Sequence, residues 1–425
     1  MQTSSAAAKP REHKTRGRGG RPRADRNLAS WLALGTFGLN VTLGAVPSVL
    51  LATQLKHIDP AHKTTDLAIV LAAGALVATA AQPVWGAVSD RTRSRYGKRS
   101  PYLLCCPLLT ALALPAMSFA TTVAMLTVTW CLVQAVLTGA AATLVTVLPD
   151  RVPAATRGRV AAWMGLGTMM GTLGGQGIAA VLVSQSLRLA YTAIAVLLVT
   201  ALTAFAFACP EPDNRSEPRR ALDIRALIRS YWINPRHHRD FAWVFVARTF
   251  LMLGYYMIAG YMLYILQDYV HLSQDRATKT VPIVSLVALA GTVTTLLPAG
   301  RLSDRIGRRK PFVAASTLAI GAGLAIPAIL PTKTGVLMMA LIAGLGFGCY
   351  NAVDNALISQ VLPSTEDTAK DMGLANISAH LPQVLAPVAS GTVIAIFGGY
   401  RTLFALALTF SLIGALCVLP VKTVR

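Results

Sequence analysis

Long runs of apolar residues without a charged side chain most constrain what this chain can fold into. Leu67–Val88, Val123–Leu148 and Ile377–Phe397 each run for about 20 residues or more without Lys, Arg, Asp or Glu. At 1.5 Å per residue, a helix of that length crosses the roughly 30 Å hydrocarbon core of a bilayer. Only 13% of the residues are charged, whereas a soluble domain carries about a quarter. The sequence therefore predicts an all-α membrane protein whose main surroundings are the lipid bilayer.

The apolar runs and the polar breaks between them predict twelve transmembrane helices in two six-helix halves. The spans lie near 28–54, 66–89, 101–120, 122–148, 159–184, 190–209, 241–266, 280–302, 311–330, 334–361, 371–396 and 401–420. These spans divide the chain into a disordered basic tail (1–27), a first bundle (28–209), a polar linker (210–240), a second bundle (241–420) and a short tail (421–425). The first tail lacks the apolar core of a signal peptide.

Positive charge is distributed unevenly between the two sides of these spans. The net charge is +21, and of the 39 Lys and Arg residues only Arg248 lies well inside a span. Seven others lie in the loops that follow odd-numbered spans or at the edge of such a loop, and the rest lie on the side of the two termini. Cytoplasmic loops carry such an excess of Lys and Arg. We therefore expect a protein of the cytoplasmic membrane with both termini cytoplasmic, and no nucleic-acid partner.

The sequence lacks the motifs of enzymes and of ATP-driven pumps. It contains no Walker loop, no His-Glu-x-x-His and no Gly-x-Ser-x-Gly element. The six cysteines lie in or at the edges of apolar spans and do not have the spacing of metal ligands. We therefore expect no enzyme activity, no metal site and no cofactor.

The two halves of the chain repeat the same landmarks. Asp90 follows span two and Asp304 follows span eight, each in a Gly-x-x-x-Asp-Arg motif. Pro149 closes span four 59 residues after Asp90, and Pro363 closes span ten 59 residues after Asp304. Six-helix halves related by a parallel repeat are typical of alternating-access transporters. The sequence thus predicts transport of a small-molecule solute.

The two loops resemble the signature loop of the major facilitator superfamily, Gly-x-x-x-Asp-Arg-x-Gly-Arg-Arg. The matching residues are Gly86, Asp90, Arg91, Gly97, Lys98 and Arg99 in the first loop, and Gly300, Asp304, Arg305, Gly307 and Arg308 in the second. The first loop has a four-residue insertion, and this longer form is similar to the glycoside–pentoside–hexuronide symporters and sucrose-transporter-like proteins. The resemblance implies the major facilitator fold and secondary active transport of a small polar, sugar-like solute by alternating access.

The resemblance also implies that the two loops act as a conformational latch. Asp90 would face the N-terminus of span eleven across the two halves, and Asp304 would face that of span five. A carboxylate at an exposed helix N-terminus contributes only about 0.3–1 kcal/mol, which is weak enough to break in every cycle. Gly86 and Gly300 would permit close approach of helices. The alternative, that the loops only orient the protein, explains the arginines but not the paired Gly and Asp.

Several residues inside the spans are candidates for a solute cavity. Arg248 and Asp354 are the charged residues well inside spans, both roughly 10 Å deep, and we infer that they pair because unpaired charge at that depth is costly. The pair serves either the structure of the second half or contact with the solute. The uncharged candidates, each of which could instead simply join helices, are Asn40, Gln134, Tyr255, Tyr256, Asn351 and His380.

The coupling ion and the direction of transport stay open. The glycoside–pentoside–hexuronide group couples to cations through acids inside spans two and four, but this chain has no acid between Asp66 and Asp90 and none in span four before Asp150. Span five contains Gly171, Gly174 and Gly175 but not the proline of the motif found in proton-driven exporters. The alternatives are an exporter of a drug or secondary metabolite and a receptor that binds a solute without moving it. A coupling proton or cation is compatible with both transporter hypotheses.

Overall fold

The computed structural model describes residues 21–153, 156–216, 239–307, 309–361 and 368–420, without the side chains of 21–26, 304 and 355–380. The N-terminal half comprises α1 (Arg21–Ala45), the π-helical turn η1 (Val46–Leu50), α2 (Leu51–Ile58), α3 (Lys63–Arg91), α4 (Ser100–Met117), α5 (Val123–Arg151), α6 (Arg157–Leu182) and α7 (Leu187–Ala208). The C-terminal half comprises α9 (Arg239–Ala259), α10 (Met262–Tyr264), the π-helical turn η3 (Ile265–Tyr269), α11 (Gln274–Ile306), α12 (Lys310–Ile329), α13 (Lys333–Val361), α14 (Thr368–Phe397) and α15 (Tyr400–Val418).

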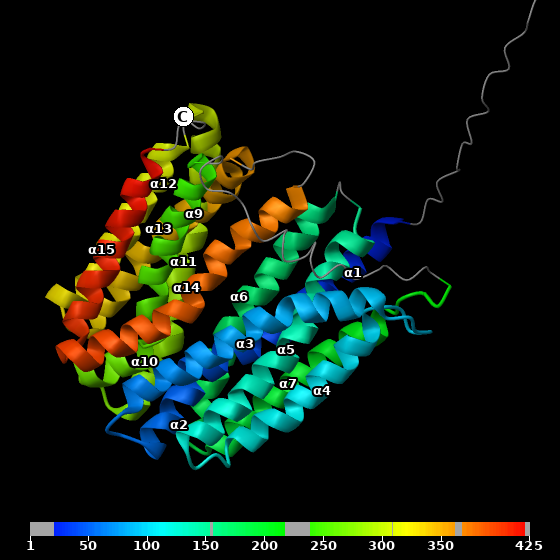
Figure 1. Cartoon of the computed structure of the whole chain (residues 1–425), viewed down its shortest axis with the longest axis horizontal. Coiled ribbons are helices and arrows are strands. Elements are labelled where there is room, and N and C mark those ends of the chain that lie inside the picture. The colour runs from blue at the N-terminus through cyan, green and yellow to red at the C-terminus, as the bar shows by residue number, and fades with distance from the viewer. Residues whose placement is uncertain (1–20, 154–155, 217–238, 308, 362–367, 421–425) are drawn as a thin grey trace, which may run out of the picture.

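The two halves pack their helices in the same pattern. In the N-terminal half, α1 packs on α6 and α7, α3 packs on α5, and α4 packs on α5 and α7. In the C-terminal half the equivalent helices do the same: α9 packs on α14 and α15, α11 packs on α13, and α12 packs on α13 and α15. The halves meet through α3 with α14 and through α6 with α11 (Figure 1). This arrangement confirms the predicted repeat of two six-helix halves.

The helices have the length and surface of membrane spans. Ten helices in the described part of the chain are long and apolar enough to cross a bilayer, and α14 adds the shorter apolar stretch Leu381–Phe397. The glycine-rich α6 is not among the ten. Large apolar side chains such as Leu112 and Ile329 are exposed by 74% and 81%, which suits contact with lipid rather than with water. The all-α membrane fold predicted from the sequence is confirmed.

The predicted tails and linker lie mostly outside the described residues. The parts that are not described are residues 1–20 and 421–425 of the tails and residues 217–238 of the linker. At the first tail, α1 begins at Arg21 and includes residues assigned to the tail. Pro22 is compatible with this start, because a proline in the first helical turn needs no hydrogen-bond partner for its nitrogen.

A stripe of glycines on α6 brings this helix close to α1. A Cβ atom at the glycine positions of the stripe would collide with the backbone of α1. The stripe is Gly167, Gly171 and Gly175, and it lies against Ala33, Phe37 and Val41. The spacing of four residues places the glycines on one face of the helix, as in the small-residue interfaces of membrane helices.

The first and seventh spans are interrupted, which the sequence analysis did not predict. In η1 the N–H of Leu51 donates to the carbonyl of Val46, and in η3 the N–H of Val270 donates to that of Ile265. Pro47 has no N–H with which to continue an α-helical ladder, and this explains the first interruption. The seventh span is also broken between α9 and α10.

Polar contacts join the halves at one end of the molecule, called here the sealed end. Lys63 Nζ of α3 forms an ion pair with Asp268 Oδ1 of η3 at 2.7 Å. Lys56 Nζ of α2 donates to Gln267 Oε1 and to Gln274 Oε1, each at 3.0 Å. In Figure 1, α2 and α10 lie at this end. The opposite end, with the α3–α4 loop and the turn that follows α11, is called here the basic end.

Candidate functional site

A cavity of about 370 Å³ lies between the two halves. Its walls come from η1 and α6 of the N-terminal half and from α9 to α13 of the C-terminal half. None of the described lining residues carries a charge. A volume of this size is within the range of pockets for small organic ligands.

The wall formed by η1 and α6 is rich in polar side chains. Thr168, Thr172 and Gln176 recur at every fourth position of α6, so they lie on one face of the helix. Each follows one glycine of the stripe that packs on α1, which fixes the orientation of this polar face toward the cavity. Ser48 of η1 completes the wall. None of these four residues was among the predicted cavity residues.

The opposite wall, formed by the C-terminal half, is mainly apolar. Its side chains from α11 and α13 include Val281, Val284, Met339 and Phe347. Two of the predicted cavity residues belong to this half of the lining, Tyr255 of α9 and Asn351 of α13. The ring of Tyr255 lies 4.6 Å, centroid to centroid, from that of Phe347. The two walls therefore differ in polarity.

Three other predicted cavity residues lie between helices instead. Asn40 Nδ2 donates to the carbonyl of Thr36 at 2.8 Å and to Thr168 Oγ1 at 3.4 Å, next to the polar wall. Gln134 of α5 packs close to Gly74 of α3. Tyr256 accepts a hydrogen bond of 3.2 Å from Gln383 Nε2 of α14. None of the three is among the described lining residues of the cavity, because each side chain is turned toward a neighbouring helix.

Arg248 and Asp354 form an ion pair inside the C-terminal half. Arg248 Nη1 lies 3.4 Å from Asp354 Oδ2, and their side chains are only 14% and 5% exposed. Neither lines the cavity between the halves. Asp354 instead borders a void of about 10 Å³ together with Tyr350 and Val418. This position favours the structural alternative over contact with the solute. The side chain of the remaining candidate, His380, lies outside the described residues.

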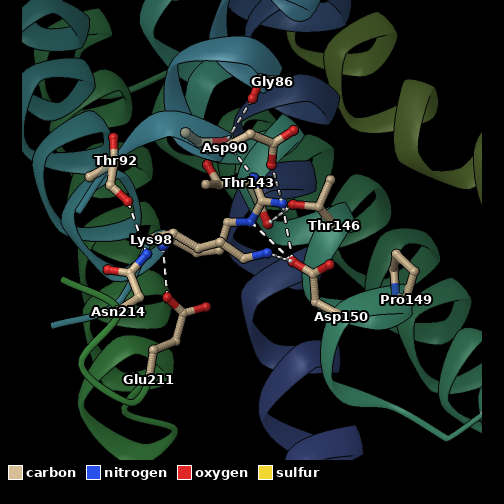
Figure 2. Close-up of polar contacts among 12 residues, drawn as sticks. Gly86, Asp90, Thr92, Lys98, Thr143, Thr146, Pro149, Asp150, Glu211 and Asn214 are labelled. Carbon is tan, nitrogen blue, oxygen red and sulfur yellow. Dashed lines mark hydrogen bonds and ion pairs between the residues drawn. The ribbon is translucent and has the colours of Figure 1, made fainter. Parts of the chain in front are cut away.

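The first signature loop forms a network around a buried arginine at the basic end. The Arg99 side chain is 4% exposed and pairs through Nη2 with Asp90 Oδ1 at 2.7 Å and with Asp150 Oδ2 at 3.1 Å. It also donates to the hydroxyl of Ser89, and Lys98 Nζ adds a second ion pair to Asp150 at 3.0 Å. Figure 2 shows Asp90 at the end of α3 and Asp150 at the end of α5 as carboxylates of this network.

The segment that follows α7 is fastened to the same loop. The Glu211 carboxylate accepts from the backbone N–H groups of Arg99 and Ser100, at 2.7 and 3.4 Å, and so caps the start of α4. Asn214 accepts from the N–H of Ser94 at 2.9 Å and donates to the carbonyl of Thr92 at 2.9 Å. In Figure 2, Glu211 and Asn214 reach the loop from the side away from α5. Neither residue was a predicted site residue, because both lie in the predicted linker.

Glycines at matching positions of the two loops have left-handed backbone. Gly97 has φ of +85° and Gly307 has φ of +66°, a conformation that residues with a Cβ atom rarely adopt. A Cβ at Gly97 would also collide with Glu211. Gly307 terminates α11, where its N–H donates to the carbonyl of Ser303 at 3.0 Å.

The expected close approach at the first glycine of each motif is not present. A Cβ at Gly86 would meet nothing within 4 Å, and one at Gly300 would make only ordinary contact with Ala352 at 3.8 Å. The prediction that Gly86 and Gly300 permit close helix packing is therefore wrong for this conformation. The close helix contacts are made by other glycines, such as those of α6. Arg91 and Arg305 have exposed side chains.

The latch itself stays a prediction. Asp90 is 51% exposed and pairs with Arg99 of its own half. The side chains at the start of α14, which Asp90 would approach, lie outside the described residues, as do the side chain of Asp304 and all of Arg308.

Comparison with known proteins relates these features to a family. The sequence matches the Major Facilitator Superfamily over residues 28–366 and 283–425. It is 32% identical over 136 residues to the multidrug resistance protein MdtL of Shewanella oneidensis, a match that covers 32% of this chain and 34% of that protein. The match thus spans about a third of the length of this curated relative.

Solved transporter structures share the fold over nearly the whole chain. The nucleoside transporter NupG is similar with a TM-score of 0.70 and 15% identity, over 93% of this chain and 99% of that one. The D-xylose-proton symporter is similar with a TM-score of 0.67 and 14% identity, over 95% and 98%. At these identities the likeness shows the fold alone. The repeated halves, the two signature loops and the match along most of the sequence show that the chain belongs to the Major Facilitator Superfamily, whose members are membrane transporters and not enzymes.

Proposed function

We propose that the protein is a secondary active transporter that moves a small, uncharged polar organic solute by alternating access. The observation that carries this proposal is the uncharged cavity between two repeated halves. The cavity lies at the interface where alternating access requires a binding site. At the sealed end the Lys63–Asp268 ion pair spans the two halves, so it would have to break for the cavity to open there.

The lining of the cavity supports a neutral solute. A charged solute would leave water without gaining an opposite charge among the described lining residues, and burial of an unpaired charge is costly. A sugar-like solute is our leading hypothesis, because the inserted signature loop resembles that of the glycoside–pentoside–hexuronide and sucrose-transporter-like group. Hydroxyl and amide groups such as those of Thr172 and Gln176 suit a hydroxylated solute.

Export of a drug or secondary metabolite is the second candidate function. The apolar wall of the cavity favours it, and so does the partial match to a multidrug resistance protein. A receptor that binds a solute without moving it is the alternative from another class. Either transporter could couple to a proton or cation.

The proposed orientation places the basic end in the cytoplasm, together with both termini. It is supported by the excess of Lys and Arg on that side of the spans. The membrane of this proposal is the cytoplasmic membrane, as predicted from the sequence.

Flux measurements test the proposed function. Cells that express the protein are assayed for uptake of a radiolabelled sugar panel and, in parallel, for resistance to a panel of toxic compounds. Sugar uptake supports the leading hypothesis, and resistance with drug efflux supports the second. The same solutes are then followed in proteoliposomes with and without a pH gradient, which reports coupling to protons. Solute binding in detergent without flux in proteoliposomes would reject transport and support the receptor.

A further inference from the structure

A groove of about 270 Å³ lies on the surface where α3 and α14 meet near the sealed end. Its described lining residues come from these two helices and carry no charge. Large apolar side chains at its rim are uncovered: Ile69 is 51%, Val388 49% and Ile396 69% exposed. In a chain that spans a membrane, such side chains face lipid. The groove shares no lining residue with the cavity between the halves.

The floor of the groove is a contact between the two halves. A Cβ atom at Gly391 of α14 would lie only 2.6 Å from the Cβ of Ala68 of α3. Behind this contact, the hydroxyl of Tyr261 lies 2.9 Å from the carbonyl oxygen of Thr64 and 3.2 Å from that of Pro387. Because each half supplies one wall, the groove requires the contact of α3 with α14 that is present when the sealed end is closed.

Two threonine hydroxyls in the groove have no hydrogen-bond partner among the described residues. Exposed threonines elsewhere on the spans, such as Thr200, Thr294 and Thr409, donate to the carbonyl four residues earlier. Thr392 makes no such bond although it lies within α14, and Thr65 in the first turn of α3 also makes none. A hydroxyl that leaves water without a new hydrogen bond is unfavourable. The groove therefore calls for an acceptor.

The depth of these hydroxyls matches the boundary between lipid headgroups and hydrocarbon. Thr65 is the third residue of α3, and Thr392 lies five residues before the end of α14, about 8 Å along the helix. The headgroup region adds roughly 5–8 Å on each side of the hydrocarbon core. Phospholipids carry their ester carbonyls at this boundary, and these carbonyls are acceptors to which the lipid itself offers no donor.

We propose that the groove binds a diacyl glycerophospholipid from the leaflet at the sealed end. One acyl chain lies along Ile69, Val388 and Ile396, and the hydroxyls of Thr392 and Thr65 donate to the ester carbonyls. A ligand that binds one conformation shifts the population toward that conformation. The bound lipid therefore stabilises the closed sealed end. This inference goes beyond the proposed function, and the binding step does not depend on the solute.

Competition between an ester lipid and an ether lipid tests the binding step. The full-length protein, delipidated in detergent, receives an equimolar mixture of dioleoyl phosphatidylcholine and its di-O-oleyl ether analogue, which has the same headgroup and chain length but no carbonyl. Native mass spectrometry separates the two complexes by mass. We expect the complex with one ester lipid to exceed the complex with one ether lipid about three- to tenfold, as one hydrogen bond provides.

Variants assign this preference to the groove. Thr392→Val keeps the shape of the side chain without the hydroxyl and should bring the ratio close to one. Thr409→Val is the matched control, because the hydroxyl of Thr409 already donates to the carbonyl of Ala405. Ala395→Phe fills the groove and should lower retention of the ester lipid, whereas Ala405→Phe at an exposed position of α15 should not. Thermal melting verifies that each variant is folded.

Spin labels at the sealed end test the effect on its closure. Ala61→Cys and Arg276→Cys place one label in each half, on a background that lacks reactive native cysteines, and both positions are exposed. Distance distributions are recorded in nanodiscs of the ester lipid and of the ether lipid. We expect a larger closed fraction in the ester lipid and equal fractions once Thr392→Val is added.

Three results would overturn the proposal. A ratio of ester to ether complexes near one would mean that the hydrocarbon chains alone cover the groove. An ester preference that the folded Thr392→Val variant retains would place the acceptor site elsewhere on the protein. Equal closed fractions in the two lipids, together with an ester preference that depends on Thr392, would reject the stabilisation of the sealed end.

Discussion

The buried ion pair between Arg248 and Asp354 yields the sharpest prediction. Asp354→Asn leaves the guanidinium of Arg248 without its counter-charge inside the C-terminal half, where the Nε atom already has no hydrogen-bond partner. The double variant Arg248→Met/Asp354→Leu removes both charges and fills the space with apolar atoms. If the pair serves the structure, the single change should be more harmful than the double change.

The size of this effect follows from the geometry. Two unit charges 3.4 Å apart attract by about 5 kcal/mol at an effective dielectric constant of about 20. Removing one partner of a buried pair typically costs about 3–5 kcal/mol, whereas replacing both with apolar residues is often close to neutral. We therefore expect Asp354→Asn to lower stability strongly and the double variant to recover most of it. Because neither residue lines the main cavity, transport should recover as well.

Thermal melting of the purified protein in detergent and solute flux in proteoliposomes measure the two outcomes. The control is Asp275→Asn, which removes one partner of the exposed pair between Lys279 and Asp275, whose side chains are 57% and 56% exposed. An exposed pair contributes at most about 1 kcal/mol, so this change should have little effect. Additive losses for Arg248→Met and Asp354→Leu would refute the reasoning. A folded but inactive double variant would show that the pair acts in transport.

Three further predictions concern the two ends of the molecule. An impermeant thiol reagent should label Lys63→Cys but not Ser216→Cys in sealed right-side-out vesicles that lack reactive native cysteines, and the opposite pattern would reverse the orientation. Asp90→Asn should fold normally, since the carboxylate is half exposed, yet lose much of its flux. Full flux by the double variant Asp90→Asn/Asp304→Asn would contradict the predicted latch. Gly97→Ala should lower the melting temperature, because left-handed backbone costs about 1–2 kcal/mol with a Cβ atom and the added methyl meets a carboxylate; an unchanged melting temperature would contradict this.

The membrane fold, the repeat and the buried ion pair could all be predicted from the amino-acid sequence. Each depends on a signal that survives without tertiary contacts. Uncharged runs of about 20 residues reflect the thickness of the bilayer, and the landmarks Asp90 and Asp304 repeat at a fixed spacing. Two lone charges inside spans have to find each other, and Arg248 and Asp354 do. Among the uncharged residues predicted to line the cavity, Tyr255 and Asn351 do line it.

Which polar side chains face the cavity depends instead on how the helices pack. In a soluble helix the apolar stripe reveals the inner face, but lipid is as apolar as the protein interior, so Gln134 and Gln176 look alike in sequence. The contact of α6 with α1 along the glycine stripe turns Gln176 toward the cavity, whereas Gln134 packs against α3. Likewise, Glu211 joins the first loop because the chain returns to it after α7, a proximity that depends on how the helices pack and that no local pattern encodes.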